Sequence, residues 1–292
     1  MSRTPQTRRL VLLTASTALV AGGTLLPSSA FAAPATPHLG NASVTAADTP
    51  DLAIDRAIAK TEKFDSAQVD MTMTSPPEGP VAMEGTFSWG DGPAMDVEVD
   101  AKAVDMQHLV SDGTVRCLFT DGAYYYEVDP QSSGPLKGKH WMKIDASALF
   151  GEQSASELSG VTSGGATSGL ELLALSDDVK NVGEETVRGK KTTHYRGVIS
   201  KDDLGGAADA LMRGDKGSPV NEFTGDVKEI TMDVWLDGND LPVRTKDQTG
   251  AVTVTTDFEK FGPTRAVEAP PAADTADMSD AVRTAVGSGP QV

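Results

Sequence analysis

The sequence predicts an α+β fold of mostly antiparallel β-strands, with about ten strands and a few helices. Apolar and polar residues alternate with a period of two through most of residues 67–261, which is typical of half-buried strands. Short turn sequences such as Asp112-Gly113 and Asp121-Gly122 separate these segments, as expected for hairpins. Apolar residues at helical spacing are confined to a few short segments. We therefore expect a sheet made of consecutive hairpins.

Residues 1–32 have the pattern of a secretory signal peptide. Arg3, Arg8 and Arg9 precede an uncharged stretch over residues 10–26, and small residues lead to Ala32, near which we expect cleavage. Polar residues and glycines interrupt that stretch, so it falls short of the roughly 20 apolar residues of a membrane span. The arginine pair also resembles a twin-arginine signal, so general secretion and twin-arginine export both remain open. The sequence thus predicts a secreted protein of the extracellular space or cell envelope.

The chain is acidic and has a single cysteine. It carries 42 acidic and 25 basic residues, and removal of the three arginines in residues 1–32 takes the net charge from −17 to −20. Nucleic acid and anionic membrane surfaces are therefore poor partners. No segment after residue 32 is apolar for long enough to predict a transmembrane span. Cys117 lies in a strand-like segment, so we expect a small buried side chain and no disulfide within the chain.

The predicted elements follow one another in a simple order. Residues 33–49 are rich in Ala, Pro, Thr and Ser and form a flexible lead-in. A helix begins at Pro50, with Asp51 as its cap, and opens a domain over residues 50–262. Further helical segments are expected over 145–150, 170–175, 202–212 and 280–286, and a mobile loop over 151–168. Residues 263–292 are predicted to be a proline-rich tail that runs over the surface. The predicted strands cover 67–74, 81–89, 95–99, 114–120, 124–126, 139–144, 179–187, 191–199, 227–236, 241–248 and 251–261.

The chain carries no motif for catalysis, for a cofactor or for a metal. It lacks the Gly-x-Ser-x-Gly elbow, a phosphate-binding loop, His-Glu-x-x-His and a cysteine pair. His38 lies in the lead-in, and His108, His140 and His194 are expected as half-exposed residues of the sheet. We predict a protein that is not an enzyme, although a hydrolase site assembled in space from one of the last three histidines remains open.

Aspartates and tyrosines offer two further candidates. Asp237, Asn239 and Asp240 lie in a turn and do not fit a calcium-binding loop, and the same holds for the aspartate pairs at 177–178 and 202–203. We interpret them as turn and capping residues. The triplet over residues 124–126 could bind a sugar or a partner, but alternating strand tyrosines more often bury one face and expose the other.

Methionines fall on the apolar phase of several predicted strands. Methionine is flexible and polarizable, so a surface lined with it can adapt to an irregular apolar ligand, and it fills ordinary gaps in a core equally well. Plain core packing is favoured by the pattern alone, because alternation only says which face is buried. The candidate lining of an apolar ligand site is Met71, Met73, Met83, Phe87, Met95, Val97, Met232 and Val234.

Three segments resemble sequences of one known family. They are the segment over residues 141–145 ahead of a short helix, the hairpin over 187–195, and residues 234–244, in which a turn precedes Leu241-Pro242-Val243-Arg244. The order of the elements is a helix, long hairpins, a helical interruption, more hairpins and a proline-marked tail. In this order and in these segments, residues 50–280 resemble the LolA-like superfamily, in particular LppX/LprG-type actinobacterial envelope proteins.

The resemblance implies a curved, open half-barrel sheet with helices on its concave face and an apolar cavity between them. It also implies a carrier of acylated lipids or lipoproteins that has no cofactor and no enzymatic activity. Proteins of this type are commonly lipoproteins, whereas no cysteine stands near Ala32, so we expect this chain to be released or held non-covalently. The alternative is an envelope protein-interaction or sensory module similar to RseB and MucB, without a lipid ligand.

Overall fold

The structure is a computed structural model that describes residues 49–76, 79–90, 92–150, 168–200 and 229–287. The expected signal peptide, almost all of the lead-in and the helix expected over 202–212 lie outside the described residues. The loop expected over 151–168 lies outside them as well, except for its last residue.

Twelve strands of the described residues form one open sheet in the order β12-β6-β5-β4-β3-β2-β1-β11-β10-β9-β8-β7. Neighbouring strands are antiparallel, except that β12 runs parallel to β6. The sheet therefore confirms the mostly antiparallel α+β fold, with twelve strands where about ten were expected. The strands are β1 (Ser66–Ser75), β2 (Gly79–Ser88), β3 (Ala94–Asp100), β4 (Thr114–Thr120), β5 (Ala123–Glu127), β6 (Trp141–Asp145), β7 (Lys180–Val187), β8 (Lys190–Ser200), β9 (Glu229–Asp237), β10 (Pro242–Thr249), β11 (Val252–Phe261) and β12 (Thr275–Asp277).

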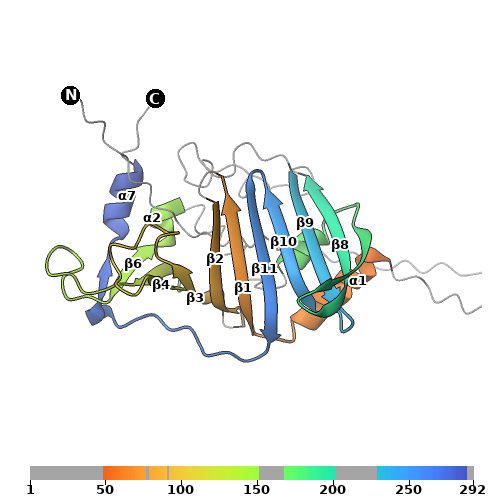
Figure 1. Cartoon of the computed structure of the whole chain (residues 1–292), viewed down its shortest axis with the longest axis horizontal. Helices are drawn as coiled ribbons and strands as arrows, with labels where there is room; N and C mark the ends of the chain where they lie inside the picture. Colours follow the sequence, from red (N-terminus) through yellow and green to blue (C-terminus); the bar gives the residue numbers. More distant parts are fainter. Residues whose placement is uncertain (1–48, 77–78, 91, 151–167, 201–228, 288–292) are drawn as a thin grey trace, which may run out of the picture.

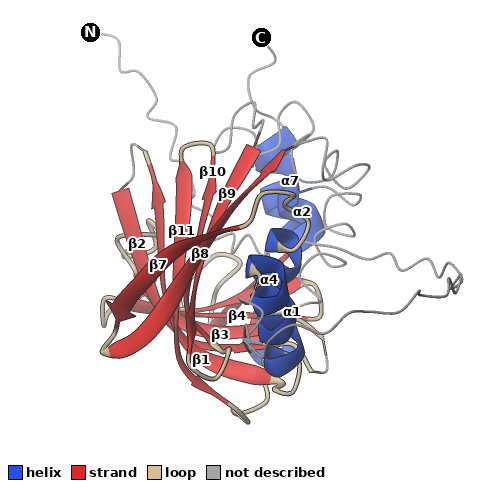
Figure 2. Ribbon diagram, turned by 90° about the vertical axis from the view of Figure 1, so that its right-hand side faces the viewer, coloured by secondary structure: helices blue, strands red, loops and turns tan. Residues whose placement is uncertain are grey.

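Helices cover one face of this curved sheet, which we call the inner face; the opposite one is the outer face (Figure 2). The helices are α1 (Pro50–Thr61), α2 (Ala146–Phe150), α4 (Ser168–Leu173) and α7 (Ser279–Gly287). A short 3-10 helix over Ala272–Asp274 precedes β12. Helix α1 begins at Pro50 as expected, but its cap is Thr49 and not Asp51. The Thr49 hydroxyl accepts from the Leu52 amide at 3.5 Å, and Asp51 lies in the first turn, where its negative charge suits the helix dipole.

The sheet changes direction between β2 and β3. In Figure 1, β1 and β2 stand nearly upright, whereas β3, β4 and β6 lie across the view. Gly85 of β2 is paired with Val97 of β3, and a Cβ atom at Gly85 would lie 2.1 Å from the carbonyl oxygen of Asp96. Only glycine permits so close an approach of the two backbones, so Gly85 allows the sheet to bend at this point.

The first and last long strands meet in the middle of the sheet. Strand β1 pairs with β11, with Met71 opposite Thr256 and Met73 opposite Val254. The β1–β6 half and the β7–β10 part of the sheet are thus joined through one antiparallel pair whose strands lie far apart in the sequence.

Two large apolar clusters lie on the inner face, beside a smaller one of Ala67, Val69 and Phe258. The β1–β6 cluster fills the space between strands β1–β6, α2 and the loop that follows β3. Helices α1 and α4 pack on β8 and β9 to form the β8–β9 cluster. The buried residues of the β1–β6 cluster are Met71, Met73, Val81, Met83, Met95, Val97, Val99, Ala101, Val104, Met106, Val115, Cys117, Tyr124, Tyr126, Val128, Leu136, Met142, Ile144, Ala146, Ala148, Leu149, Val254 and Ala276. Those of the β8–β9 cluster are Ala53, Ile54, Ala57, Leu170, Leu172, Leu173, Tyr195, Ile199, Ile230, Met232, Val234 and Leu236.

The segment after β11 becomes part of the sheet. Sequence alone predicted a surface tail for residues 263–292, but Thr275–Asp277 pair with β6, and Met278 and Val282 pack against the β1–β6 cluster. On the outer face, Val267 packs against the group of apolar residues that contains Tyr125. Tyr125 is therefore buried, as are Tyr124 and Tyr126 on the inner face, so the triplet does not leave one face exposed as its alternation suggested.

Candidate functional site

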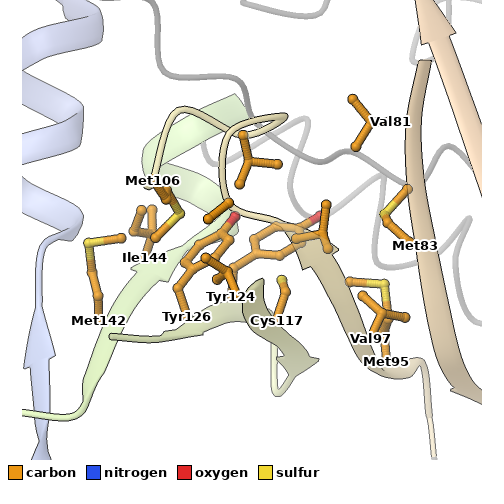
Figure 3. Close-up of a cluster of buried hydrophobic side chains, with 14 of the residues drawn as sticks. Val81, Met83, Met95, Val97, Met106, Cys117, Tyr124, Tyr126, Met142 and Ile144 are labelled. Carbon is orange, nitrogen blue, oxygen red and sulfur yellow. The ribbon is translucent and has the colours of Figure 1, made fainter. Parts of the chain in front are cut away.

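Strand register aligns apolar side chains in rows across the inner face. One row runs from Val97 through Cys117 and Tyr126 to Met142, across β3, β4, β5 and β6. Figure 3 shows this part of the β1–β6 cluster, with Met83 and Met95 on one side and Met106 and Met142 on the other. Burial raises the pKa of the Cys117 thiol to about 12, as expected for the small buried side chain that the sequence predicted.

The candidate lining residues lie on this face but in two groups. Those on β1, β2 and β3 belong to the β1–β6 cluster, with Phe87 packed partly buried against it, whereas Met232 and Val234 belong to the β8–β9 cluster. All of them except Phe87 are at most 7% exposed. The inner surface is therefore packed, and a ligand would have to separate helices from strands.

Helix α4 lies closely against the Met232 side chain. A Cβ atom at Gly169 would be 3.3 Å from Met232 Cε, and one at Gly197 of β8 would be 2.6 Å from Leu173 Cδ1. Two glycines thus bring the helix and the sheet together, which explains why Met232 is 3% exposed.

Polar residues separate the two clusters on the inner face of β10 and β11. Thr245 is paired with Val234 on one side and with Thr256 on the other, and Asp247 lies between Met232 and Val254 in the same way. We call Thr245, Asp247 and Thr256 the polar strip. Thr245 and Thr256 are 7% and 8% exposed, and no residue of the polar strip belongs to either of the two large apolar clusters.

Asp247 is the unusual member of the polar strip. The residue as a whole is partly exposed, but its Oδ1 atom is buried and has no hydrogen-bond partner among the described residues. Burial raises the pKa of its carboxyl group to about 7, and the nearby negative charge of Asp233 acts in the same direction. Sequence reasoning missed this residue, although an aspartate on the inward phase of a central strand was a signal that could have found it.

The outer face of the same strands carries paired charges instead. Asp233 of β9 accepts from Arg196 Nε at 2.6 Å and contacts His194 Nε2 at 2.6 Å. The other ring nitrogen, Nδ1 of His194, lies 2.7 Å from Oε1 of Glu185. The imidazole also stacks on Trp235 with 4.2 Å between ring centroids. Both ring nitrogens and one face of this buried imidazole are therefore occupied by structural contacts.

A second paired carboxylate lies further along the outer face. Asp257 of β11 accepts two hydrogen bonds from Arg244, at 2.6 and 2.8 Å. Arg188, in the turn between β7 and β8, reaches the same carboxylate at 3.3 Å and also pairs with Asp70 of β1 and with Glu259. The Arg188-Gly189 turn has positive φ at both residues, as a tight hairpin turn requires. These ion pairs connect the β7–β8 hairpin to the middle of the sheet.

The histidines differ from the sequence prediction. His194 is in a strand but buried rather than half-exposed, while His108 and His140 are exposed and precede β4 and β6 instead of lying in them. The ring of His140 pairs with Asp274 at 2.8 Å. In the described part of the chain, neither His140 nor His194 hydrogen-bonds a serine, threonine or cysteine side chain.

The aspartates around the β9–β10 turn act as turn residues. Oδ1 of Asp237 accepts from the amides of Asn239 and Leu241, at 2.8 and 3.2 Å, and Asp240 pairs with Arg56 of α1. Among the described residues, no three histidines, cysteines or acidic residues are grouped to hold a metal ion. Within the same residues, no helix has the length and apolar character needed to cross a membrane.

A small pocket of about 210 Å³ lies on the outer face under residues 265–271. Its wall includes Arg116, which pairs with Asp96 at 2.7 Å and lies over the ring of Trp141 at 5.9 Å. The pocket is separated from the candidate lining by the thickness of the sheet.

No protein-family model matches the chain. One similar protein is "Putative lipoprotein SCO4650" of Streptomyces coelicolor, 27% identical over 75% of this chain and 72% of that protein. A 31.2 kDa protein of Streptomyces griseus is 26% identical over 80% of this chain and 81% of its own length. Both similarities extend over most of each sequence.

Solved structures with a similar outline include the lipoprotein LppX of Mycobacterium tuberculosis. It is 14% identical, with 75% of this chain and 98% of LppX covered and a TM-score of 0.48. The chain resembles LppX-type proteins. LprF of Mycobacterium bovis is 11% identical over 76% of this chain and 97% of LprF, with a TM-score of 0.44. A LolA superfamily protein of Nitrosomonas europaea is 8% identical over 75% of this chain and 94% of its own length, with a TM-score of 0.27. LppX and a LolA superfamily protein, which represent the groups named in the sequence analysis, are thus among the similar structures.

Proposed function

We propose that this chain is an exported, non-catalytic carrier that holds an acylated lipid or a lipoprotein between the inner face of its sheet and the helices. The observation that carries the proposal is the inner face itself, where two methionine-containing apolar clusters flank one polar strip. The proposed lining is Met71, Met73, Met83, Phe87, Met95, Val97, Met232 and Val234.

The physical balance of such binding favours long acyl chains. A ligand must displace side-chain and helix contacts, because the candidate lining is buried. Burial contributes about 0.8 kcal/mol per methylene, so a chain of about 16 carbons contributes on the order of 10 kcal/mol. Methionine side chains can rearrange around such a chain more readily than branched ones. A hydrocarbon ligand can therefore bind without a polar motif in the sequence.

Binding of acyl probes tests the proposal. We expect purified protein to take up fluorescent acyl probes, and each added methylene to raise affinity about three- to fourfold until the space is filled. Native mass spectrometry of protein isolated from its own envelope should show a co-purifying lipid. Absence of lipid together with absence of probe uptake would overturn the proposal.

A matched pair of variants locates the site. Val254 faces the inner side between Met73 and Asp247, whereas Thr255, its neighbour in β11, is paired with Thr72 and Lys246 on the outer side. Val254→Trp should fill the inner space and lower probe affinity at least about tenfold, and Thr255→Trp should leave it unchanged. Circular dichroism checks the fold of both variants. The chain-length series uses the wild type alone, so it tests the proposal even if a variant does not fold.

The alternative function, an envelope protein-interaction module, is favoured by the tight packing of the inner face. It predicts a specific protein partner in a crosslinking experiment and no uptake of acyl probes. Uptake that follows chain length would exclude a module without a lipid ligand.

A further inference from the structure

We propose that Asp247, with Thr245 and Thr256, binds the uncharged, hydrogen-bond-donating part of an acylated ligand, such as a hydroxyl or an amide. This inference rests on the proposed carrier function and deepens it. It assigns the polar strip to the ligand's polar group and the clusters on either side to its hydrocarbon.

The position of the strip is the first argument. Strand β10 carries Asp247 between Met232 of the β8–β9 cluster and Val254 of the β1–β6 cluster. A ligand that lay across the inner face would place hydrocarbon against both clusters and its middle against β10. The strip is thus the polar surface that a ligand spanning the two clusters would meet.

The second argument is that Asp247 differs from its neighbours on the outer face. Asp233 and Asp257 are buried, and each is held by an arginine within 2.6 Å. Oδ1 of Asp247 is also buried, but no group in the described part of the chain hydrogen-bonds it. An unsatisfied buried acceptor destabilises a protein, so a function for it in binding explains why the chain keeps a carboxyl group there.

The chemistry of the strip selects the class of ligand. The carboxyl group offers an acceptor, and the two threonine hydroxyls can donate or accept. No lysine or arginine is paired with these three residues on the inner face. Their cross-strand partners are Met71, Met232, Val234 and Val254, and Thr245 and Thr256 pair with each other. A phosphate or carboxylate would therefore lack a positive charge here and would lie beside an acid. Neutral donors fit the strip better than anions do.

Three probes that share one saturated sixteen-carbon chain test the inference. They are a monoacylglycerol, which donates hydrogen bonds, a methyl ester, which does not, and a lysophosphatidic acid, which is anionic. We expect the wild type to bind the monoacylglycerol about tenfold more tightly than the ester, the effect of one or two buried hydrogen bonds. The lysophosphatidic acid should bind more weakly than the monoacylglycerol.

Variants at position 247 assign the preference to this residue. Asp247→Leu should remove the difference between monoacylglycerol and ester without weakening the ester. Asp247→Asn, which keeps an acceptor and removes the charge, should retain the difference and improve binding of the lysophosphatidic acid. Gln248→Leu, at the exposed neighbouring position in β10, is the matched control and should behave as the wild type. If Asp247→Leu does not fold, the Asn variant still carries the test through the anionic probe.

The outcomes separate this inference from the proposed function. Binding of all probes without a preference, or a preference that survives Asp247→Leu, overturns the role of Asp247 and leaves the carrier function standing. Failure of the wild type to bind any probe overturns the carrier function and this inference with it.

Discussion

Buried carboxyl groups on the two faces of strands β9, β10 and β11 differ in whether they have hydrogen-bonding or charged partners. On the outer face, Asp233 and Asp257 are satisfied by arginines, and Asp233 also by a histidine. On the inner face, the Oδ1 atom of Asp247 has no partner in the described part of the chain. A satisfied ion pair keeps the strands together, whereas an unsatisfied carboxyl group costs stability. Asp233 and Asp257 therefore have a role in stabilising the fold, whereas stability does not explain the presence of Asp247.

The largest expected effect is on the outer face. Asp233→Leu leaves His194 buried without one of its two acidic partners and removes the hydrogen-bonded partner of Arg196. Because Arg196 is half exposed, we expect a loss on the order of 3 kcal/mol, at the lower end for a broken buried pair. Urea unfolding measures it, with Asp280→Leu, at a 98% exposed side chain, as the control. A loss no larger than that of the control would end the distinction between the faces.

A change of opposite sign is expected on the inner face. Burial raises the pKa of the Asp247 carboxyl to about 7 in the folded chain, from an ordinary value of 3.8. Folding therefore favours its protonated form, and the stability from this group is full below about pH 4 and is lost as the pH rises towards 7. Asp247→Asn should accordingly stabilise the protein at pH 8, on the order of 2 kcal/mol, and should have little effect near pH 4.

Urea midpoints of the wild type and the Asn variant across pH 4 to 8 measure this difference. A destabilised variant at pH 8 would show that the carboxylate is satisfied in solution. It would remove the contrast with Asp233.

The contact of α4 with the inner face has a smaller expected effect. In Gly197→Ala, the new methyl group would meet Leu173 and Ser176 at less than 3 Å, the nearest distance being 2.6 Å. We expect a loss of about 1 to 2 kcal/mol from overpacking. Gly238→Ala is the control, because nothing lies within 4 Å of its added atom. Equal stability of the two variants would mean that α4 rests loosely on the sheet.

The smallest effect is expected at the exposed ion pair of His140 and Asp274. The His140 side chain is 56% exposed, and surface pairs of this kind contribute little. His140→Ala should leave the urea midpoint unresolved from that of the wild type at both pH 5 and pH 8. A clear loss at pH 5 alone would show that an exposed pair can match the buried ones.

Much of the fold could be predicted because most of its pairing is local. The hairpins over β1–β6, β7–β8 and β9–β11 follow from alternation and turn sequences, and they formed where expected. Strand β12 could not be found, since three residues are too few to show a period and its partner β6 lies more than 130 positions earlier. The burial of Tyr125 depends on Val267, which also lies after β11 and far from Tyr125 in the sequence, so it was missed for a similar reason.

The candidate lining was harder to assess than the strands. Alternation placed these residues on one phase, but their division into two clusters depends on the strand order through β1, β11, β10 and β9. That order brings Asp247 between Met232 and Val254, and no local pattern encodes it. The burial of His194 could not be predicted either. It results from stacking on Trp235 and from contact with Asp233, and both residues lie far from His194 in the sequence.

The pairing of β1 with β11 also bears on how the chain assembles. The centre of the sheet forms only when residues 252–261 pair with residues 66–75. Pairing between strands so far apart in the sequence is slow compared with closure of a hairpin. A chain that emerges with its amino end first can form the hairpins of β1–β6 one after another. The edge of β1 that later pairs with β11 is still unpaired at that stage. During that interval the exposed edge of β1 is open to pairing with another chain, until β11 takes its place beside it.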